Sequence, residues 1–473
     1  MDIFEAHQKL KAKEISPSEL TRQCLDKALK SKNNSFISIV EDFAHQCALE
    51  SEKRIQKNGP QTYLDGIPFS LKDLFITKGI RTTAGSMILA NYIPPYDGYV
   101  SEKLKKAGGT LIGKTNCDEF GMGSTNENSY FGPVSNPLNR KFVPGGSSGG
   151  SAVSVLEGSS FYSMGTDTGG SIRLPANFCG LISLRPSYGR ISRYGQIAHS
   201  SSLDQCAPLG KSVTDMACLL EALTEYDVRD ATNVPLGTMS IAQDVHQTPP
   251  EHLKGKKIGV YAPFIDACKP LVKSSLEKAL KHCEEAGAKI VTIDLRHLKY
   301  AISTYYIIST SEASSNLARF DGIHYGLRES DGQGLEQTYQ KSRSRGFGNE
   351  VKRRILLGTY SLSAGYYDAY YKKACQMRRL IFDDFQSAFK SCDVIFSPVC
   401  ASTAFPVDMS QKSPTEMYIN DFYTVPIALA GLPGLALPYG KGENDLPTGF
   451  QLIGKPFGEK ELLKIGRALE LTY

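Results

Sequence analysis

The chain has 473 residues, enough to bury a large hydrophobic core. Hydrophobic residues make up 41% of it and charged residues 22%, which is the composition of an ordinary soluble globular protein. The formal net charge of +5 is small for this length and the basic residues are spread out, so charge gives no argument for nucleic-acid binding.

The 11 cysteines and 8 histidines form no metal-binding or disulfide pattern. There is no CxxC, HxxxH or HExxH, so we expect reduced thiols, no structural zinc and no other metal site. The N-terminal residues resemble neither a signal peptide nor an Arg-rich transit peptide, and no apolar run approaches membrane-spanning length. We therefore expect a chain that is not secreted and binds no membrane, in a bacterial cytoplasm or in a mitochondrial or other organelle matrix.

The first 60 residues are expected to be mainly helical. Ser16 to Glu19 form a capping box with proline at the first helical position, and a second helix is expected from about Glu41 to Ile55. A short apolar strand then ends at Lys72. A lysine at this point is either anchored at the surface, which general statistics favour, or drawn into a site.

Strand and helix patterns alternate through the middle of the chain. The clearest unit is a strand over Lys257–Tyr261, a helix over Leu271–Ala286 and a strand over Lys289–Ile293, which reads as βαβ. Three further segments are a helix over Tyr99–Ala107, a strand over Gly108–Thr115 and a helix near Thr214–Leu223, which is followed by a polar loop to about Gly255. This alternation predicts an α/β fold.

The C-terminal third combines a predicted loop, a long helix and further strands. Asp321 to Asn349 is rich in Gly, Ser and Arg and is interpreted as a loop. Ser361 to Phe389 is predicted to be one helix whose tyrosine stripe packs against the core rather than lining a cofactor site. Strands are expected at Val394–Pro398, Leu435–Pro438 and Gly449–Gly454, before a last helix from about Glu459.

The stretch from Pro144 to Pro186 is the strongest candidate for a functional site. It holds two glycine-serine clusters, Gly145–Ser151 and Thr166–Ser171, in which the glycines let the backbone approach a ligand closely. A phosphate cradle is one interpretation, but the stretch has no GxxxxGK[ST] and no lysine in either cluster. A nucleophile elbow is another, since GGSSG matches G-x-S-x-G, but no apolar strand directly precedes it.

The third interpretation is serine chemistry with a lysine as the base. Thr168 to Ser171 would then supply both a nucleophile and consecutive backbone amides for a developing oxyanion. At this point the motifs GGSSGGSA and GTDTGGSIRLPA, with GIPFSLKD upstream, resemble the amidase signature family. The resemblance implies that Ser171 is the nucleophile, Ser147 a bridging serine after a cis peptide bond, and Lys72 the base. It also implies roles for the flanking residues: Ser148 in support, and the amides of Thr168, Gly169 and Gly170 as the oxyanion hole.

The same resemblance implies the fold and its organisation. We expect a single large α/β domain over residues 1–473, with a central mixed β-sheet covered by helices on both faces. Within it we expect a helical segment over about 1–60 and a catalytic core over about 61–225. The remainder would complete the sheet and a glutamine pocket.

Further stretches are similar to the branch of the family that supplies ammonia for tRNA-dependent amidation: Leu111–Ser124, Ser192–Gly195, Ser202–Gln205, Glu350–Ile355 and Gly365–Lys372. This similarity implies hydrolysis of glutamine through an ester on Ser171. Ammonia would pass through a tunnel to a partner, the amidotransferase B-subunit, which uses ATP and Mg²⁺ to amidate Glu-tRNA(Gln). A small third subunit is also implied, and no cofactor in this chain. A free-standing amidase for another carboxamide and a catalytically silent scaffold are the alternatives.

A free glutamine needs its α-carboxylate and α-ammonium held, for which an Arg/Asp pair is the simplest solution. By resemblance we assign Arg354 to the carboxylate and Asp421 to the ammonium, with Gly123 and Ser124 also in the substrate pocket. Tyr305, or its neighbour Tyr306, is expected to line this pocket. The alternative is that Arg354 and Asp421 form a surface ion pair.

The sequence departs from the family pattern at several positions near these motifs. They include Cys117, Gly121, Lys211 and the run Ala198-His199-Ser200, where more apolar residues are usual. These departures concern the substrate loops rather than the catalytic set. His199 is interpreted as a local variation rather than an additional base.

Overall fold

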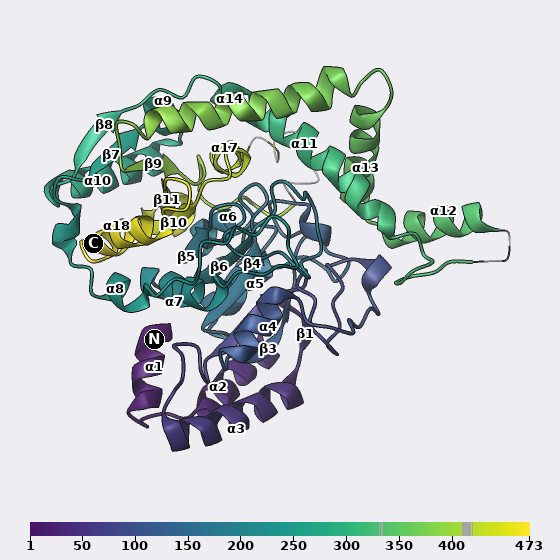
Figure 1. Cartoon of the computed structure of the whole chain (residues 1–473), viewed down its shortest axis with the longest axis horizontal. Coiled ribbons are helices and arrows are strands. Elements are labelled where there is room, and N and C mark those ends of the chain that lie inside the picture. Colours follow the sequence, from purple (N-terminus) through teal and green to yellow (C-terminus); the bar gives the residue numbers. More distant parts are fainter. Residues whose placement is uncertain (331, 333, 409–417, 419) are drawn as a thin grey trace.

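The computed structural model describes residues 1–330, 332, 334–408, 418 and 420–473 (Figure 1). Its centre is an 11-stranded sheet in the order β1-β3-β2-β4-β6-β5-β10-β11-β9-β7-β8, counted over these residues. The strands are β1 (Phe36–Ile39), β2 (Pro68–Lys72), β3 (Thr110–Thr115), β4 (Tyr162–Thr166), β5 (Ile182–Arg185), β6 (Cys206–Gly210), β7 (Lys257–Val260), β8 (Lys289–Thr292), β9 (Val394–Pro398), β10 (Gly434–Lys441) and β11 (Pro447–Ile453).

Helices flank this sheet. The α-helices are α1 (Ile3–Lys11), α2 (Pro17–Lys30), α3 (Glu41–Asn58), α4 (Tyr99–Lys106), α5 (Gly149–Leu156), α6 (Arg173–Cys179), α7 (Val213–Leu223), α8 (Ala242–His246), α9 (Ala262–Asp266), α10 (Pro270–Glu285), α11 (Ala301–Asn316), α12 (Leu335–Gly346), α13 (Asn349–Leu362), α14 (Lys373–Ala388), α17 (Val425–Leu429) and α18 (Glu459–Glu470). The helix α5 packs against β2, β3, β4 and β6, whereas α6 packs against β5, β10 and β11. The predicted α/β fold with a central mixed sheet is therefore confirmed.

Strand direction changes along the sheet. The strand β2 lies parallel to both β3 and β4, and β7 lies parallel to β8 and β9. The strands between these two parallel groups pair antiparallel, and β10 and β11 connect them. Because the residues of β2 and β4 are buried throughout, their carboxyl ends can present side chains within the molecule.

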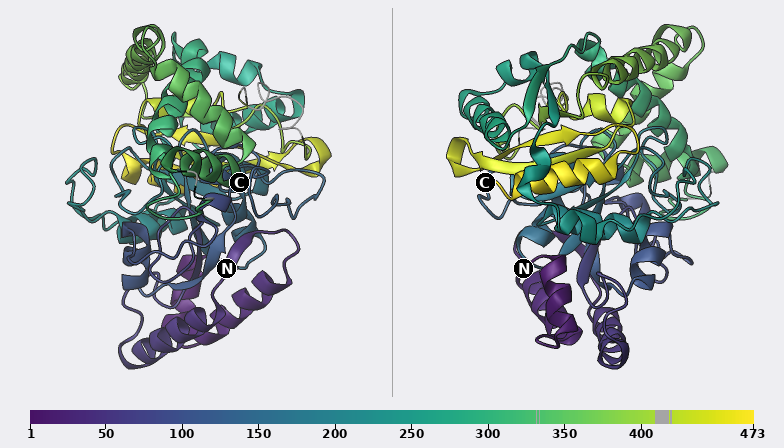
Figure 2. Two further views of the ribbon diagram at one scale, coloured as in Figure 1. Left: turned by 90° about the vertical axis from the view of Figure 1, so that its right-hand side faces the viewer. Right: turned by 60° about the vertical axis from the view of Figure 1, so that its left-hand side comes forward.

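The N-terminal helices lie at one end of the molecule and β7, β8 and α10 toward the other (Figures 1 and 2). The predicted capping box of α2 is present, because the Ser16 side chain accepts from the Glu19 amide and the Glu19 side chain from the Ser16 amide. At this end α1 packs on α7, and the Ile3 amide donates to Asp215. The helical segment is thus attached to the sheet-bound part of the chain.

Two predictions for the C-terminal half are wrong. The predicted loop over 321–349 contains the helix α12, which extends away from the body (Figure 1) and buries only small or polar side chains and a glycine. The predicted helix over 361–389 is interrupted, because α13 ends at Leu362 and Gly365 takes a left-handed φ of 84°. A π-helical turn over Asp368–Lys372 then leads into α14.

The tyrosines that follow this break do not pack in the core. Tyr366 is 41% exposed, Tyr367 46% and Tyr370 40%, so the interpretation of the stripe as core packing is wrong. The rings of Tyr366 and Tyr370 contact each other and Tyr360 instead. A tyrosine can be exposed at low cost because its hydroxyl stays hydrated.

Candidate active site

Lys72 is the last residue of β2 and is fully buried. Its Nζ donates hydrogen bonds to Ser147 Oγ at 2.7 Å, to Ser148 Oγ at 2.9 Å and to Thr166 Oγ1 at 2.7 Å. Lys72 is thus drawn into a site and is not anchored at the surface. Burial disfavours the ammonium form and lowers the pKa of Lys72 to about 8, which makes the neutral amine accessible near physiological pH.

Ser147 and Ser148 lie immediately before α5. The Gly146–Ser147 peptide bond is cis, as expected, and the Ser148 amide donates to the Ser171 carbonyl at 3.1 Å. This backbone bond joins the two glycine-serine clusters. The buried Asp118 supports the first cluster, because its amide donates to the Ser147 carbonyl at 3.3 Å.

The second cluster forms the loop between β4 and α6. Gly170 has a φ of 140°, and a Cβ there would overlap the hydroxyl of Thr424, so only glycine fits. Thr424 Oγ1 in turn donates to the Gly169 carbonyl at 2.6 Å. Within the described residues, the backbone amides of Thr168, Gly169, Gly170 and Ser171 have no hydrogen-bond acceptor. No hydrogen bond within the described structure therefore competes with the predicted role of these amides.

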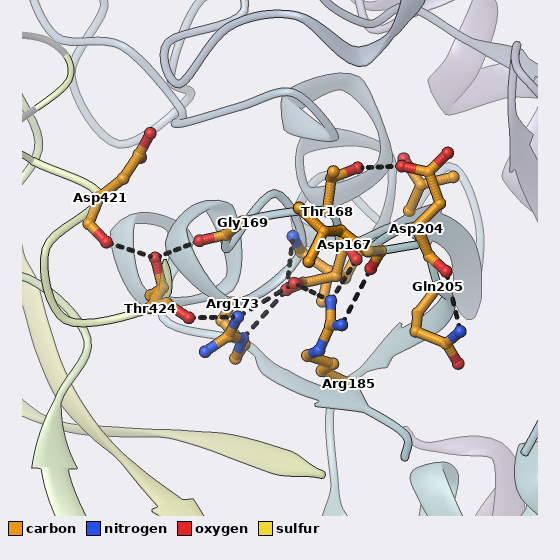
Figure 3. Close-up of polar contacts among 12 residues, drawn as sticks. Asp167, Thr168, Gly169, Arg173, Arg185, Asp204, Gln205, Asp421 and Thr424 are labelled. Carbon is orange, nitrogen blue, oxygen red and sulfur yellow. Dashed lines mark hydrogen bonds and ion pairs between the residues drawn. The ribbon is translucent and has the colours of Figure 1, made fainter. Parts of the chain in front are cut away.

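A buried charge network underlies this loop (Figure 3). The Asp167 carboxylate pairs with Arg173 at 3.0 Å and with Arg185 at 2.8 Å, and all three side chains are fully buried. Burial alone would raise the pKa of Asp167, but the two guanidinium groups outweigh it and hold that pKa well below its ordinary value. On the far side of the loop, Thr168 Oγ1 donates to Asp204 Oδ1 at 2.7 Å.

Ser171 is 9% exposed, whereas Lys72 and Ser147 are 0% exposed. Over the described part of the chain, the structure gives no hydrogen bond between the Ser147 and Ser171 hydroxyls. The bridging role predicted for Ser147 needs hydrogen bonds to both Lys72 and Ser171. The hydrogen bond to Lys72 is present, and the one to Ser171 is not formed among the described residues. The catalytic roles of the three residues remain a prediction.

Arg354 and Asp421 are both buried, so the interpretation as a surface ion pair is wrong. Asp421 accepts hydrogen bonds from Ser124 Oγ at 2.9 Å and from Tyr306 Oη at 2.7 Å. The guanidinium carbon of Arg354 lies 5.5 Å from the ring centroid of Tyr306, and its Nε donates to Glu350 at 2.8 Å. Tyr306 therefore contacts both Arg354 and Asp421. Burial raises the pKa of Asp421 to about 6.

Tyr305 and Tyr306 have different contacts. Tyr305 lies against Gly169, where an added Cβ would be 2.6 Å from its hydroxyl, whereas Tyr306 contacts both Arg354 and Asp421. Gly123 lies against the Asp118 carboxylate. Both tyrosines therefore border the candidate site, and the hydrogen bond to Asp421 belongs to Tyr306.

Sequence reasoning missed three residues that shape this site: Thr166, Asp204 and Thr424. Thr166 begins the second glycine-serine cluster and Asp204 lies in the stretch Ser202–Gln205, so local signals for both were present. Thr424 had no local signal, since it approaches the loop from a distant part of the chain.

Over the described residues, no group of three or more His, Cys, Asp and Glu side chains is arranged to hold a metal ion. In the same part of the chain, no helix combines the length and apolar character needed to cross a membrane.

The sequence matches the model of the amidase family over residues 19–463. The chain belongs to the amidase family. It is 48% identical over 473 residues to the A-subunit of glutamyl-tRNA(Gln) amidotransferase of Geobacter sp. (strain M21), covering 99% of this chain and 96% of that protein. It is also 44% identical to the protein of the same name from Pelagibacter ubique (strain HTCC1062), with the same coverage of both chains.

Solved structures agree with this assignment. The crystal structure of the glutamyl-tRNA(Gln) amidotransferase A-subunit from Thermotoga maritima is 36% identical, with a TM-score of 0.81, and the match covers 99% of this chain and 94% of that one. The native peptide amidase from Stenotrophomonas maltophilia is 26% identical with a TM-score of 0.83, over 100% of this chain and 96% of that one.

Proposed function

We propose that this chain is the glutamine-hydrolysing A-subunit of a tRNA-dependent amidotransferase that acts on Glu-tRNA(Gln). The observation that carries the proposal is the buried Lys72, hydrogen-bonded to Ser147 and Ser148 next to a loop with four available amides. Nearly full-length relatives that are 44–48% identical and bear this name support the choice of substrate.

In the proposed reaction, Ser171 Oγ attacks the side-chain carbonyl carbon of glutamine. Its proton moves through Ser147 to neutral Lys72, while the amides of Thr168 to Ser171 stabilise the oxyanion. The C–N bond then breaks, and the proton on Lys72 returns through Ser147 to the leaving nitrogen, which departs as ammonia. A water molecule attacks the glutamyl ester by the same route in reverse, which releases glutamate and restores the Ser171 hydroxyl.

The pocket would hold the α-groups of glutamine away from the reacting bond. Arg354 would bind the carboxylate, and Asp421, held by Ser124 and Tyr306, the ammonium. Both side chains are buried, so their charges are screened little by solvent and favour a zwitterionic substrate.

Released ammonia would pass to the partner B-subunit, which would use ATP and Mg²⁺ to amidate the tRNA-bound glutamate; a small third subunit would complete the assembly. This chain itself would need no cofactor and would contact tRNA mainly through its partner. Such an enzyme would work in a bacterial cytoplasm or in an organelle matrix.

Ammonia release from glutamine, measured for the chain alone and with the partner B-subunit, Glu-tRNA(Gln) and ATP, tests this proposal. We expect the complete mixture to stimulate ammonia release strongly. Ser171→Ala should release no ammonia with or without the partner. Turnover of other carboxamides that is indifferent to the partner would instead favour a free-standing amidase, as the fold shared with the peptide amidase suggests. No turnover with any carboxamide would indicate a silent scaffold.

A further inference from the structure

His199 is a buried histidine whose ring has no partner. It lies in the loop between β5 and β6 and is 2% exposed. Neither Nδ1 nor Nε2 has a hydrogen-bond partner among the described residues. Since leaving a buried polar group unpaired costs about 1–3 kcal/mol, such a group in a native structure calls for an explanation.

The backbone of His199 is tied directly to the candidate active site. Its amide donates to Asp204 Oδ2 at 2.9 Å, while Asp204 Oδ1 accepts from Thr168 at 2.7 Å (Figure 3 shows the latter bond). One carboxylate therefore connects His199 to the loop that carries Ser171. The His199 carbonyl accepts from Asn316 Nδ2 at 3.2 Å. Asn316 ends α11, the helix that also carries Tyr305 and Tyr306.

Burial, reinforced by nearby positive charges, disfavours protonation of the His199 ring. Burial lowers the pKa of His199 well below its ordinary value, and the positive charges of Arg354 and Lys72 lower it further. Lys72 is the proposed base and Arg354 the proposed carboxylate-binding residue, so both charges that act on the ring belong to the candidate site. A neutral imidazole offers one N–H donor and one nitrogen acceptor.

We propose that a ring nitrogen of His199 forms a hydrogen bond to an α-group of the bound amide substrate, and that this contact favours glutamine over apolar carboxamides. The inference rests on the proposed function, because that function supplies the substrate. A site built to hydrogen-bond a polar substrate rejects an analogue that lacks the polar group, because the buried group is then left unpaired.

Kinetics of His199→Phe and His199→Gln test the contact. With glutamine we expect His199→Phe to raise KM about tenfold, as the loss of one buried hydrogen bond implies, and His199→Gln to recover part of the affinity. With pentanamide, which lacks both α-groups, the two variants should keep kcat/KM within about twofold of the wild type. His7→Phe is the matched control, because His7 Nδ1 is also unpartnered but lies on α1, away from the site.

A spectroscopic measurement separates substrate contact from a structural role. In Ser171→Ala protein labelled with ¹⁵N-histidine, glutamine should shift the ring-nitrogen resonances of His199, identified among the 8 histidines by their loss in His199→Phe. Unchanged resonances under conditions where calorimetry shows bound glutamine would overturn the inference. Equal KM values for glutamine in the folded variants would do the same. If His199→Phe does not fold, His199→Gln and the resonances of His199 decide the matter.

If the proposed function is wrong, the wild-type protein releases no ammonia from glutamine, and this result is distinct from any effect of the His199 variants. The His199 variants are then compared on the carboxamide that the wild type hydrolyses best, alongside an analogue of that amide without its polar groups. A loss confined to the polar amide supports the contact, and equal kcat/KM values overturn it.

Discussion

Lys72 illustrates how burial can prepare a side chain for chemistry. A free lysine has a pKa near ~10.4 and is protonated at neutral pH, so it cannot accept a proton. In this fold the strand β2 carries Lys72 into the interior, where only hydroxyl groups are its hydrogen-bond partners among the described residues. Hydroxyls can accept from an ammonium or donate to an amine, so both protonation states can be accommodated.

The lowered pKa of Lys72, about 8, predicts that turnover increases with pH. Below this pKa Lys72 is mostly protonated and cannot act as a base, so kcat/KM for glutamine should rise with pH and level off above about 8. Lys72→Ala should abolish turnover while circular dichroism shows an intact fold. Substantial ammonia release by Lys72→Ala at neutral pH would contradict the mechanism.

Tyr306→Phe should weaken glutamine binding. The change removes the hydrogen bond to Asp421, so burial raises the pKa of that carboxyl further above about 6 and reduces its charge at neutral pH. We expect KM for glutamine to rise about tenfold at neutral pH, in line with loss of a hydrogen bond to a charged group. Tyr439→Phe is the control, because Tyr439 lies on β10, outside the candidate pocket, and the change removes the hydrogen bond between its hydroxyl and His282 Nδ1. Equal KM values for the two variants would argue against the assignment of Asp421.

The residues that sequence could identify are those that sit in local motifs. Ser147 and Ser171 lie in two glycine-serine clusters whose composition is unusual, whereas Lys72 was assigned only through the family resemblance. Thr424 and the hydrogen bond of Tyr306 could not be found, since both depend on contacts between segments far apart in the chain. The burial of Arg354 and Asp421 also required the tertiary structure.

At the scale of elements, the loop between β4 and α6 depends on the network below it. Arg173 belongs to α6, Arg185 to β5, and Asp167 to the loop itself, so a single carboxylate fixes three elements. A guanidinium pair this deeply buried is tolerated only because the carboxylate lies between the two groups.

Asp167→Asn should therefore destabilise the protein strongly. The change leaves two buried positive charges facing each other, and breaking a buried pair typically costs about 3–5 kcal/mol. The free energy of unfolding in urea measures the effect. Asp383→Asn is the matched control, because it breaks an exposed pair with Arg379 on α14 and should change stability by less than about 1 kcal/mol. A similar small effect at Asp167 would show that the network does not hold the loop.

The elements that were predicted wrongly from the sequence are those whose apolar residues do not recur at helical spacing. In α12 the buried positions are Thr338, Ser342 and Gly346, which give no hydrophobic pattern for a helix to be recognised by. The break before α14 depends on one left-handed glycine among tyrosines that look like core residues. The βαβ unit of β7, α10 and β8 was predicted well because its apolar positions are regular.

At the scale of the whole molecule, one large hydrophobic cluster includes residues from Ile3 in α1 to Leu469 in α18, and three smaller clusters accompany it over the described residues. All 11 cysteines are free; Cys375 is exposed, Cys47 is partly buried and the others are buried. A thiol reagent should thus modify Cys375 fast in the native protein and Cys47 slowly. The remaining thiols should become reactive together on unfolding. Cys375→Ser should remove the fast phase, and several fast native thiols would contradict the burial of the other cysteines.

The position of β10 and β11 in the sheet also has a consequence for the order in which the protein can fold during its synthesis. The strand β5 cannot pair with β10, nor β9 with β11, until those later strands have been synthesised. At about 5–20 residues per second, the ribosome needs tens of seconds to add the segment between Arg185 and Gly434. Throughout that time β5 lacks its partner β10, and an unpaired strand edge is a template for aggregation. The hairpin of β10 and β11 covers this edge of β5 once it has been synthesised.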